Sequence, residues 1–147
     1  MNTSVKGPWS VEEIGKFLSE TRYPLRLACV AEDGYPRVVS VWFTLLEGKL
    51  YCATHKSSQL MALLRGNNRV GFEVAPNAPP YCGVRGQGDV VLSGHGGAQM
   101  LEQLLGRYLG GQDSHLAKWL LSRSEDEMLI TITPRRWFSW DYRERME

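Results

Sequence analysis

Closely spaced turn signals constrain this chain more than any other feature, because they leave room only for short strands joined in sequence. An Asp-Gly pair at 33–34 precedes an apolar and aromatic run at 37–46, and a Glu-Gly-Lys turn at 47–49 separates that run from another at 50–54. An Asp-Gly pair supplies the positive φ that a tight hairpin turn requires. Strands joined by tight turns pair antiparallel, so these runs and a strand at 25–31 predict a three-stranded meander.

The rest of the chain continues as short strands and short helices. We expect helices over 11–20, from 57 or 58 to 65, over 98–109 and from 114 to about 122, and strands over 69–75, 83–93, 128–133 and 136–142. Three glycines within 83–93 predict a β-bulge, or a close approach by another backbone or a ligand. Pro134 separates the last two strands. About six strands without βαβ alternation predict a mainly β, α+β fold, an antiparallel barrel with flanking helices.

Length and composition are those of a single globular domain covering residues 1–147. Hydrophobic residues make up 43% and charged residues 22% of the chain, which argues against disorder. The formal net charge of +1 gives no reason to expect nucleic acid or an anionic membrane as partner. The N-terminus lacks the apolar core of a signal peptide, and no apolar run reaches the ~20 residues of a membrane span.

Cysteine and histidine are sparse and widely spaced. Cys29, Cys52 and Cys82 form no CxxC pair, and each lies in an apolar run. We therefore expect buried thiols in a reducing cytoplasm rather than a disulfide framework. The three histidines have no partner at a metal-binding spacing, so no metal site is expected. The acidic run at 125–127 indicates a solvated turn.

A polar cluster at 54–59 lies between the strand at 50–54 and the next expected helix. It contains the hydroxyls of Thr54, Ser57 and Ser58 and the ammonium group of Lys56. These groups and the free N–H groups of a helix start can bind a phosphate, because the helix dipole favours an anion there. A serine that only caps the helix is the simpler alternative. The residues alone leave both interpretations open.

Several segments in order resemble one known family. They read LRLACVAEDGYPRVVSVWF, KLYCATH, LLRGNNRVGFEV, VRGQGDVVLSG and ITITPRRWFSW. Their order and spacing are similar to those of the FMN-binding split-barrel superfamily named after pyridoxamine 5'-phosphate oxidase, over about residues 11–142, although no single motif is decisive. The resemblance implies a six-stranded split β-barrel that forms a homodimer, with two FMN sites at the dimer interface.

The resemblance also implies which residues bind the cofactor. Matched by position, the strand beside the isoalloxazine ring contains Arg37, Val38, Val39 and Ser40. The segment at the ring and phosphate end contains Ala53 and Thr54. The phosphate site contains Ser57, Ser58 and Gln59. Trp140 matches an aromatic residue that the second subunit contributes near the flavin. Where the family often has Lys or Arg, this chain has Gln59 and Leu60, so Lys56 or a charge from elsewhere would neutralise the phosphate.

The implied function is that of an FMN-binding oxidoreductase with a small-molecule substrate. No residue pattern indicates the substrate, the electron donor or a catalytic side chain, so the flavin would carry the chemistry. The chain lacks the C-terminal Arg/His segment of true pyridoxamine phosphate oxidases, and that activity is not expected. Relatives with this fold leave two alternatives, an F420-dependent reductase and a non-catalytic flavin- or haem-binding dimer.

Overall fold

The computed structural model describes residues 3–146, and its elements follow the expected order. The helices are α1 (Val11–Glu20), α2 (Gln59–Gly66), α3 (Gly97–Leu109) and α4 (His115–Leu121), with 3₁₀ turns η1 (Ser124–Asp126) and η2 (Glu144–Met146). The strands are β1 (Ser4–Lys6), β2 (Leu25–Val30), β3 (Pro36–Val41), β4 (Thr44–Leu46), β5 (Lys49–His55), β6 (Arg69–Val74), β7 (Cys82–Ser93) and β8 (Glu127–Asp141). In this part of the chain no helix is long and apolar enough to cross a membrane.

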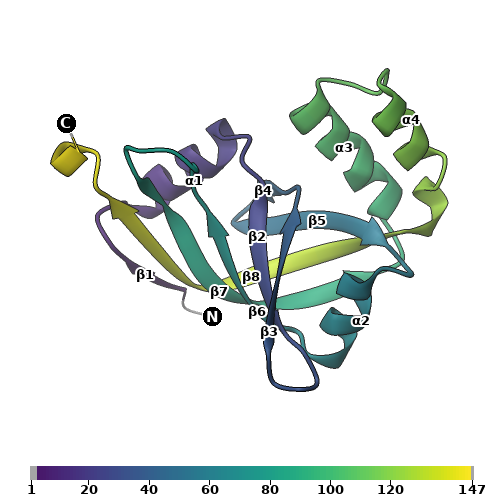
Figure 1. Cartoon of the computed structure of the whole chain (residues 1–147), viewed down its shortest axis with the longest axis horizontal. Coiled ribbons are helices and arrows are strands. Elements are labelled where there is room, and N and C mark those ends of the chain that lie inside the picture. Colours follow the sequence, from purple (N-terminus) through teal and green to yellow (C-terminus); the bar gives the residue numbers. More distant parts are fainter. Residues whose placement is uncertain (1–2, 147) are drawn as a thin grey trace.

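The strands form one eight-stranded sheet in the order β3-β2-β6-β7-β8-β5-β4, and β1 pairs in parallel with β8. All other pairs are antiparallel. Figure 1 shows the sheet curling into a half-barrel, with α1 at one end and α3 and α4 side by side at the other. The predicted split-barrel class with flanking helices is confirmed, but the described residues contain eight strands rather than six.

One additional strand arises because the expected run at 37–46 is interrupted at Trp42 and Phe43. The part before the break, β3, pairs with β2, and the part after it, β4, pairs with β5. Phe43 is fully buried, and its amide N–H donates to the hydroxyl of Tyr108 on α3 at 3.3 Å. Trp42 stacks on the Tyr108 ring at 5.3 Å. Contacts with a distant helix therefore redirect the chain, and local periodicity contains no sign of them.

The two strands expected on either side of Pro134 are one continuous strand, β8. The register between β7 and β8 shifts at Gln87 and Gly88, so that Gly88 pairs with Pro134 and Gln87 with Arg136. This bulge confirms the prediction from the glycines of the 83–93 segment. A bulge tolerates a residue without an N–H group, which explains how β8 continues through the proline.

The interior of the curled sheet holds the main hydrophobic core, to which α1 and α2 contribute one face each. Cys29 and Cys52 are completely buried there as free thiols, and Cys82 is buried beside them, as predicted. A second, smaller cluster of Leu101, Leu105 and Ala117 joins α3 to α4 outside the main core. The helix pair therefore forms a separate wall at one end of the molecule.

Candidate functional site

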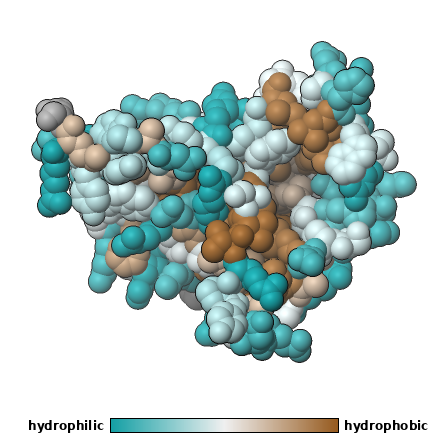
Figure 2. Space-filling view, viewed as in Figure 1, coloured by the Kyte–Doolittle hydropathy of each residue, from teal (hydrophilic) through white to brown (hydrophobic). Residues whose placement is uncertain are grey.

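A cavity of about 680 Å³ lies between the α3–α4 pair and the strands and helix that face it. Figure 2 shows two apolar areas on this side of the molecule with a hollow between them. The cavity is lined by Arg37, Val38, Val39, Ser40, Val41, Trp42, Ala53, Thr54, Ser58, Gln59, Leu60, Leu63, Leu101, Leu104, Leu116, Leu120 and Glu127. Its volume is in the roughly 300–1,000 Å³ range of ligand pockets.

Most of the cofactor residues expected from the sequence lie together in this cavity. The lining contains the whole segment 37–40, both Ala53 and Thr54 of β5, and Ser58 and Gln59 at the start of α2. These residues come from three elements that are separated in the chain. The fold thus brings the expected ring end and the expected phosphate end into one space.

The start of α2 combines a helix cap with free backbone donors. The hydroxyl of Ser58 accepts a hydrogen bond from the Met61 N–H at 3.1 Å and another from the Thr54 hydroxyl at 3.0 Å. Ser58 is therefore the N-cap of α2, as the simpler interpretation proposed. Within residues 3–146, nothing accepts the N–H groups of Gln59 and Leu60. Such free donors at a helix start suit an anion, so the cap and an anion site are compatible.

Lys56 and Ser57 lie outside the cavity, although both belong to the predicted phosphate segment. The Lys56 ammonium group forms an ion pair with Asp126 at 2.9 Å, and its backbone N–H donates to the Asp126 carbonyl at 2.9 Å. The hydrogen bond from Lys56 lowers the pKa of Asp126 below its usual range. The Ser57 hydroxyl contacts Nδ1 of His55 at 2.7 Å. The Lys56 side chain is thus engaged with η1, and the Ser57 side chain is engaged within the turn that precedes α2.

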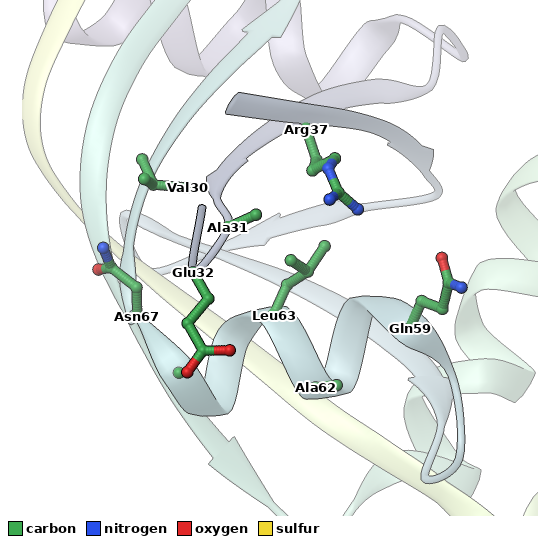
Figure 3. A pocket seen from close by; sticks show the side chains of 9 residues that line it. Val30, Ala31, Glu32, Arg37, Gln59, Ala62, Leu63 and Asn67 are labelled. Carbon is green, nitrogen blue, oxygen red and sulfur yellow. The ribbon is translucent and has the colours of Figure 1, made fainter. Parts of the chain in front are cut away.

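Arg37 is the cation that borders the cavity. Its side chain is half exposed, and its ion pair with Asp33 is long, at 3.6 Å. Figure 3 shows Arg37 from β3 and Gln59 from the start of α2 pointing into the same space. That space opens into a second cavity of about 700 Å³, which runs along α2 as far as Asn67 and Glu32. A positive group therefore lies near the free N–H groups of α2.

Glu127 is a lining residue that the sequence prediction missed. The run at 125–127 was expected to be a solvated turn, but Glu127 is only 8% exposed and begins β8 opposite His55 of β5. Burial raises the pKa of its carboxyl, and the nearby Arg123 opposes that effect only in part. The expectation failed because this residue is part of a strand that α3 covers. Alternation along β8 puts Glu127 on the face of Leu129, Thr131 and Thr133, opposite the buried Ile130 and Ile132, so the local sequence contains no signal for its burial.

Trp140 does not line the cavity of its own chain. It lies near the end of β8, opposite Gly83 of β7, and the guanidinium of Arg85 is 5.5 Å from its ring centroid. Trp42 is instead the aromatic residue at the cavity wall. A contact between Trp140 and a ligand in the cavity would require a second subunit.

Comparison with known proteins gives a consistent result for the fold. The family model described as pyridoxamine 5'-phosphate oxidase matches residues 10–141. A conserved hypothetical protein from Mycobacterium tuberculosis is 24% identical, with a TM-score of 0.76 over 94% of this chain and 88% of that one. An F420 reductase is 22% identical, with a TM-score of 0.71 over 83% of this chain and 94% of that one. A FAD-binding protein from Mesorhizobium loti is also 22% identical, with a TM-score of 0.64 over 89% of this chain and 93% of that one. No curated protein matches. At these identities the structural likeness shows the fold alone.

Proposed function

Because the chain belongs to the pyridoxamine 5'-phosphate oxidase-like family, we propose that it is an FMN-binding oxidoreductase that acts on a small molecule. The observation that carries the proposal is that an exposed strand edge, a helix start and an apolar wall meet in the cavity of about 680 Å³. A flavin needs these features: hydrogen-bonding groups for the ring, an anion site for the phosphate and an apolar surface for the ring face.

The phosphate would lie at the start of α2. The free N–H groups of Gln59 and Leu60 supply donors there, and so does the hydroxyl of Ser58, which accepts from Thr54 and Met61 and keeps its own proton for a ligand. Arg37 supplies the positive charge that Gln59 and Leu60 lack, and a guanidinium binds phosphate oxygens in a fixed, two-pronged geometry. Lys56 is not required for this arrangement, because its charge is already paired with Asp126.

The ring would lie along β3, which is an edge strand of the sheet. An edge strand has one row of backbone N–H and C=O groups without a neighbouring strand. Segment 38–40 can therefore hydrogen-bond the polar edge of a flavin through its backbone, whatever its side chains are. When bound, FMN supplies hydride or electron transfer, while the protein positions the ring and limits its contact with water.

F420 is the alternative cofactor that one similar structure suggests, since that protein is a reductase named for it. Its anionic tail would need a basic groove. The second cavity is adjacent to Arg37 but contains the carboxylate of Glu32, and Arg85 lies over the Phe138 and Trp140 rings instead. These charges favour FMN. None of the described residues that line the main cavity is a His, Cys, Met or Tyr, the usual axial ligands of haem, which weighs against haem there.

We also propose that the protein is a homodimer in the cytoplasm, with the cofactor at the subunit interface. Val38 on β3 is 69% exposed at the cavity edge, and Val30 on β2 is 43% exposed. A second copy would cover these apolar side chains. It would also bring the partner's Trp140 towards the flavin.

The test is an absorbance spectrum of the purified protein and an FMN titration of the flavin-free protein. We expect a yellow protein, or FMN binding that quenches flavin fluorescence, and bleaching of the bound flavin by a reduced nicotinamide or by dithionite. A colourless protein that FMN cannot reconstitute would refute the proposal. Competition between FMN and F420 discriminates the two cofactors, and tight binding without turnover in any reductase assay would indicate a non-catalytic flavin protein.

A further inference from the structure

Glu127 has a buried carboxyl group to which the proposed cofactor site assigns no role. It is 8% exposed and lines the cavity, and none of the described residues donates a hydrogen bond to its carboxylate. A buried charged group is normally paired or hydrogen-bonded, because its transfer out of water is costly. Arg123, the positive group that lowers the pKa of Glu127, lies with its guanidinium 4.6 Å from the centroid of the Trp119 ring and makes no ion pair with Glu127.

The surroundings of Glu127 in the cavity are apolar. Leu101 and Leu104 of α3 and Leu116 and Leu120 of α4 form the wall of the cavity, while Ala53 packs with the cluster that joins these helices. Leu116 is 49% exposed although it borders the cavity. Figure 1 shows α3 and α4 at the opposite side from α2, where the phosphate is proposed to bind.

We infer that this α3–α4 end of the cavity is a substrate site for an apolar molecule that carries a positively charged or N–H-bearing nitrogen, which Glu127 binds. The inference rests on the proposed function, since it names the substrate class of the flavin site. The leucines would remove the apolar part of the ligand from water, and the carboxylate would gain the donor that the protein does not provide. The raised pKa of the free carboxyl agrees with an incomplete site, because a cationic ligand would restore the charged form.

Three probes of the same size can test this site: 4-phenylbutylamine, 4-phenylbutanol and 4-phenylbutyrate. Their binding is measured by isothermal titration calorimetry at neutral pH, with FMN-saturated and with flavin-free full-length protein. We expect the amine to bind at least about tenfold tighter than the alcohol, and the carboxylate to show no binding, because only the amine completes the Glu127 ion pair.

Two substitutions make the test specific. Glu127→Gln keeps the shape of the side chain and is expected to reduce the affinity for the amine to that for the alcohol. Glu127→Leu is expected to reverse the preference, so that the alcohol binds better than the amine. Glu125→Gln is the matched control, since Glu125 is exposed and close in sequence but does not line the cavity. Far-UV circular dichroism and the unfolding temperature verify that each variant folds.

The inference is overturned if the amine does not bind, if it binds no better than the alcohol, or if its preference survives in Glu127→Gln. FMN titrations of the same samples separate this result from the cofactor proposal. If the wild-type protein does not bind FMN, the proposed function is refuted. If it binds FMN but its preference for the amine does not depend on Glu127, only the substrate class is refuted.

Discussion

At the start of α2, the positive charge for the proposed phosphate site would come from Arg37 rather than from Lys56. At the proposed phosphate site, the position where the family often has a basic residue holds Gln59, and the nearest lysine along the chain, Lys56, is paired with Asp126. Arg37 reaches the same space from a different strand. Proximity in sequence therefore suggested Lys56, and proximity in space favours Arg37.

Replacing Arg37 tests this assignment. We expect Arg37→Gln to weaken FMN binding by about 1.5–3 kcal/mol, because a charge-assisted hydrogen bond to phosphate is lost. Lys56→Gln is the matched control and should change the affinity for FMN by less than about 0.5 kcal/mol. Its ammonium group is paired with Asp126, and the loss of such an exposed ion pair changes the stability of the protein little. Fluorescence titration with FMN measures both. A larger effect for Lys56→Gln than for Arg37→Gln would show that Lys56 supplies the positive charge for the phosphate.

The hydroxyls of Thr54 and Ser58 have two roles that can be separated. The double substitution Thr54→Ala with Ser58→Ala should weaken FMN binding by about 1–3 kcal/mol. Loss of the Ser58 cap should also lower stability by about 1 kcal/mol. Ser10→Ala, which removes the cap of the distant helix α1, is the control for stability without binding. If FMN affinity is unchanged in the double variant, Ser58 acts as a cap only.

Glu127 should make stability depend on pH in a definite direction. Because burial raises the pKa of its carboxyl in the folded state, the folded protein holds this proton more tightly than the unfolded chain. The stability that protonation gives is complete below the unfolded pKa and is lost as pH rises through the raised folded pKa. A glutamine at position 127 does not ionise, so the Glu127→Gln variant does not lose this stability as pH rises. Its unfolding temperature should therefore rise relative to that of the wild type as pH increases above about 4, with Glu125→Gln as the exposed control.

The position of α3 depends on two contacts at opposite ends of the helix. At its start, a Cβ on Gly97 would lie 2.1 Å from the carbonyl oxygen of Glu127, so only glycine lets the helix approach β8 this closely. Near its end, the Arg107 guanidinium donates to the carbonyls of Leu18 at 2.7 Å and Thr21 at 2.6 Å, where α1 ends. These contacts hold the apolar wall of the cavity against the barrel.

Two glycines of α3 give a matched pair of substitutions. Gly97→Ala should destabilise the protein by about 1–3 kcal/mol, because the added methyl group collides with backbone rather than with a flexible side chain. Gly106→Ala has open space around it and should stabilise the helix by about 0.5–1 kcal/mol. Urea unfolding monitored by circular dichroism gives both values. Equal effects of the two substitutions would show that α3 does not depend on this close approach.

At the level of the whole molecule, the proposed second subunit would account for the edge strand β3 and for the position of Trp140. β3 is the end of the sheet order, and Trp140 lies on β8 outside the cavity of its own chain. A monomer leaves Val38 exposed at the edge of the cavity. We therefore expect the complete site to contain two chains.

Light scattering after size-exclusion chromatography tests the dimer directly, with an expected mass of about twice the 16.6 kDa of the chain. In that dimer Trp140→Ala should reduce FMN affinity by about 0.5–1.5 kcal/mol, through the loss of an aromatic contact. Trp119→Ala, on the exposed side of α4, is the control. A monomeric mass together with unchanged affinity in Trp140→Ala would exclude a shared site.

Local patterns in the sequence determined the elements of this protein. The Asp-Gly turn with a positive φ at Gly34, the glycine bulge of β7 and the α2 cap at Ser58 are all present as predicted. Each depends on hydrogen bonds or steric limits between residues close in the chain, so its signal is contained in a short window. The order of these elements also indicated the split barrel.

Tertiary structure alone decided the composition of the cavity. The break at Trp42 and Phe43 depends on Tyr108, and the burial of Glu127 depends on α3. Arg37 lines the cavity while Lys56 is drawn to Asp126 outside it. Each of these depends on which distant segment packs on a residue. Hydrophobic packing is non-directional, and many partners satisfy the same local pattern. The chain therefore specifies its strands and turns locally, while the folded molecule determines which charged side chains line the cavity.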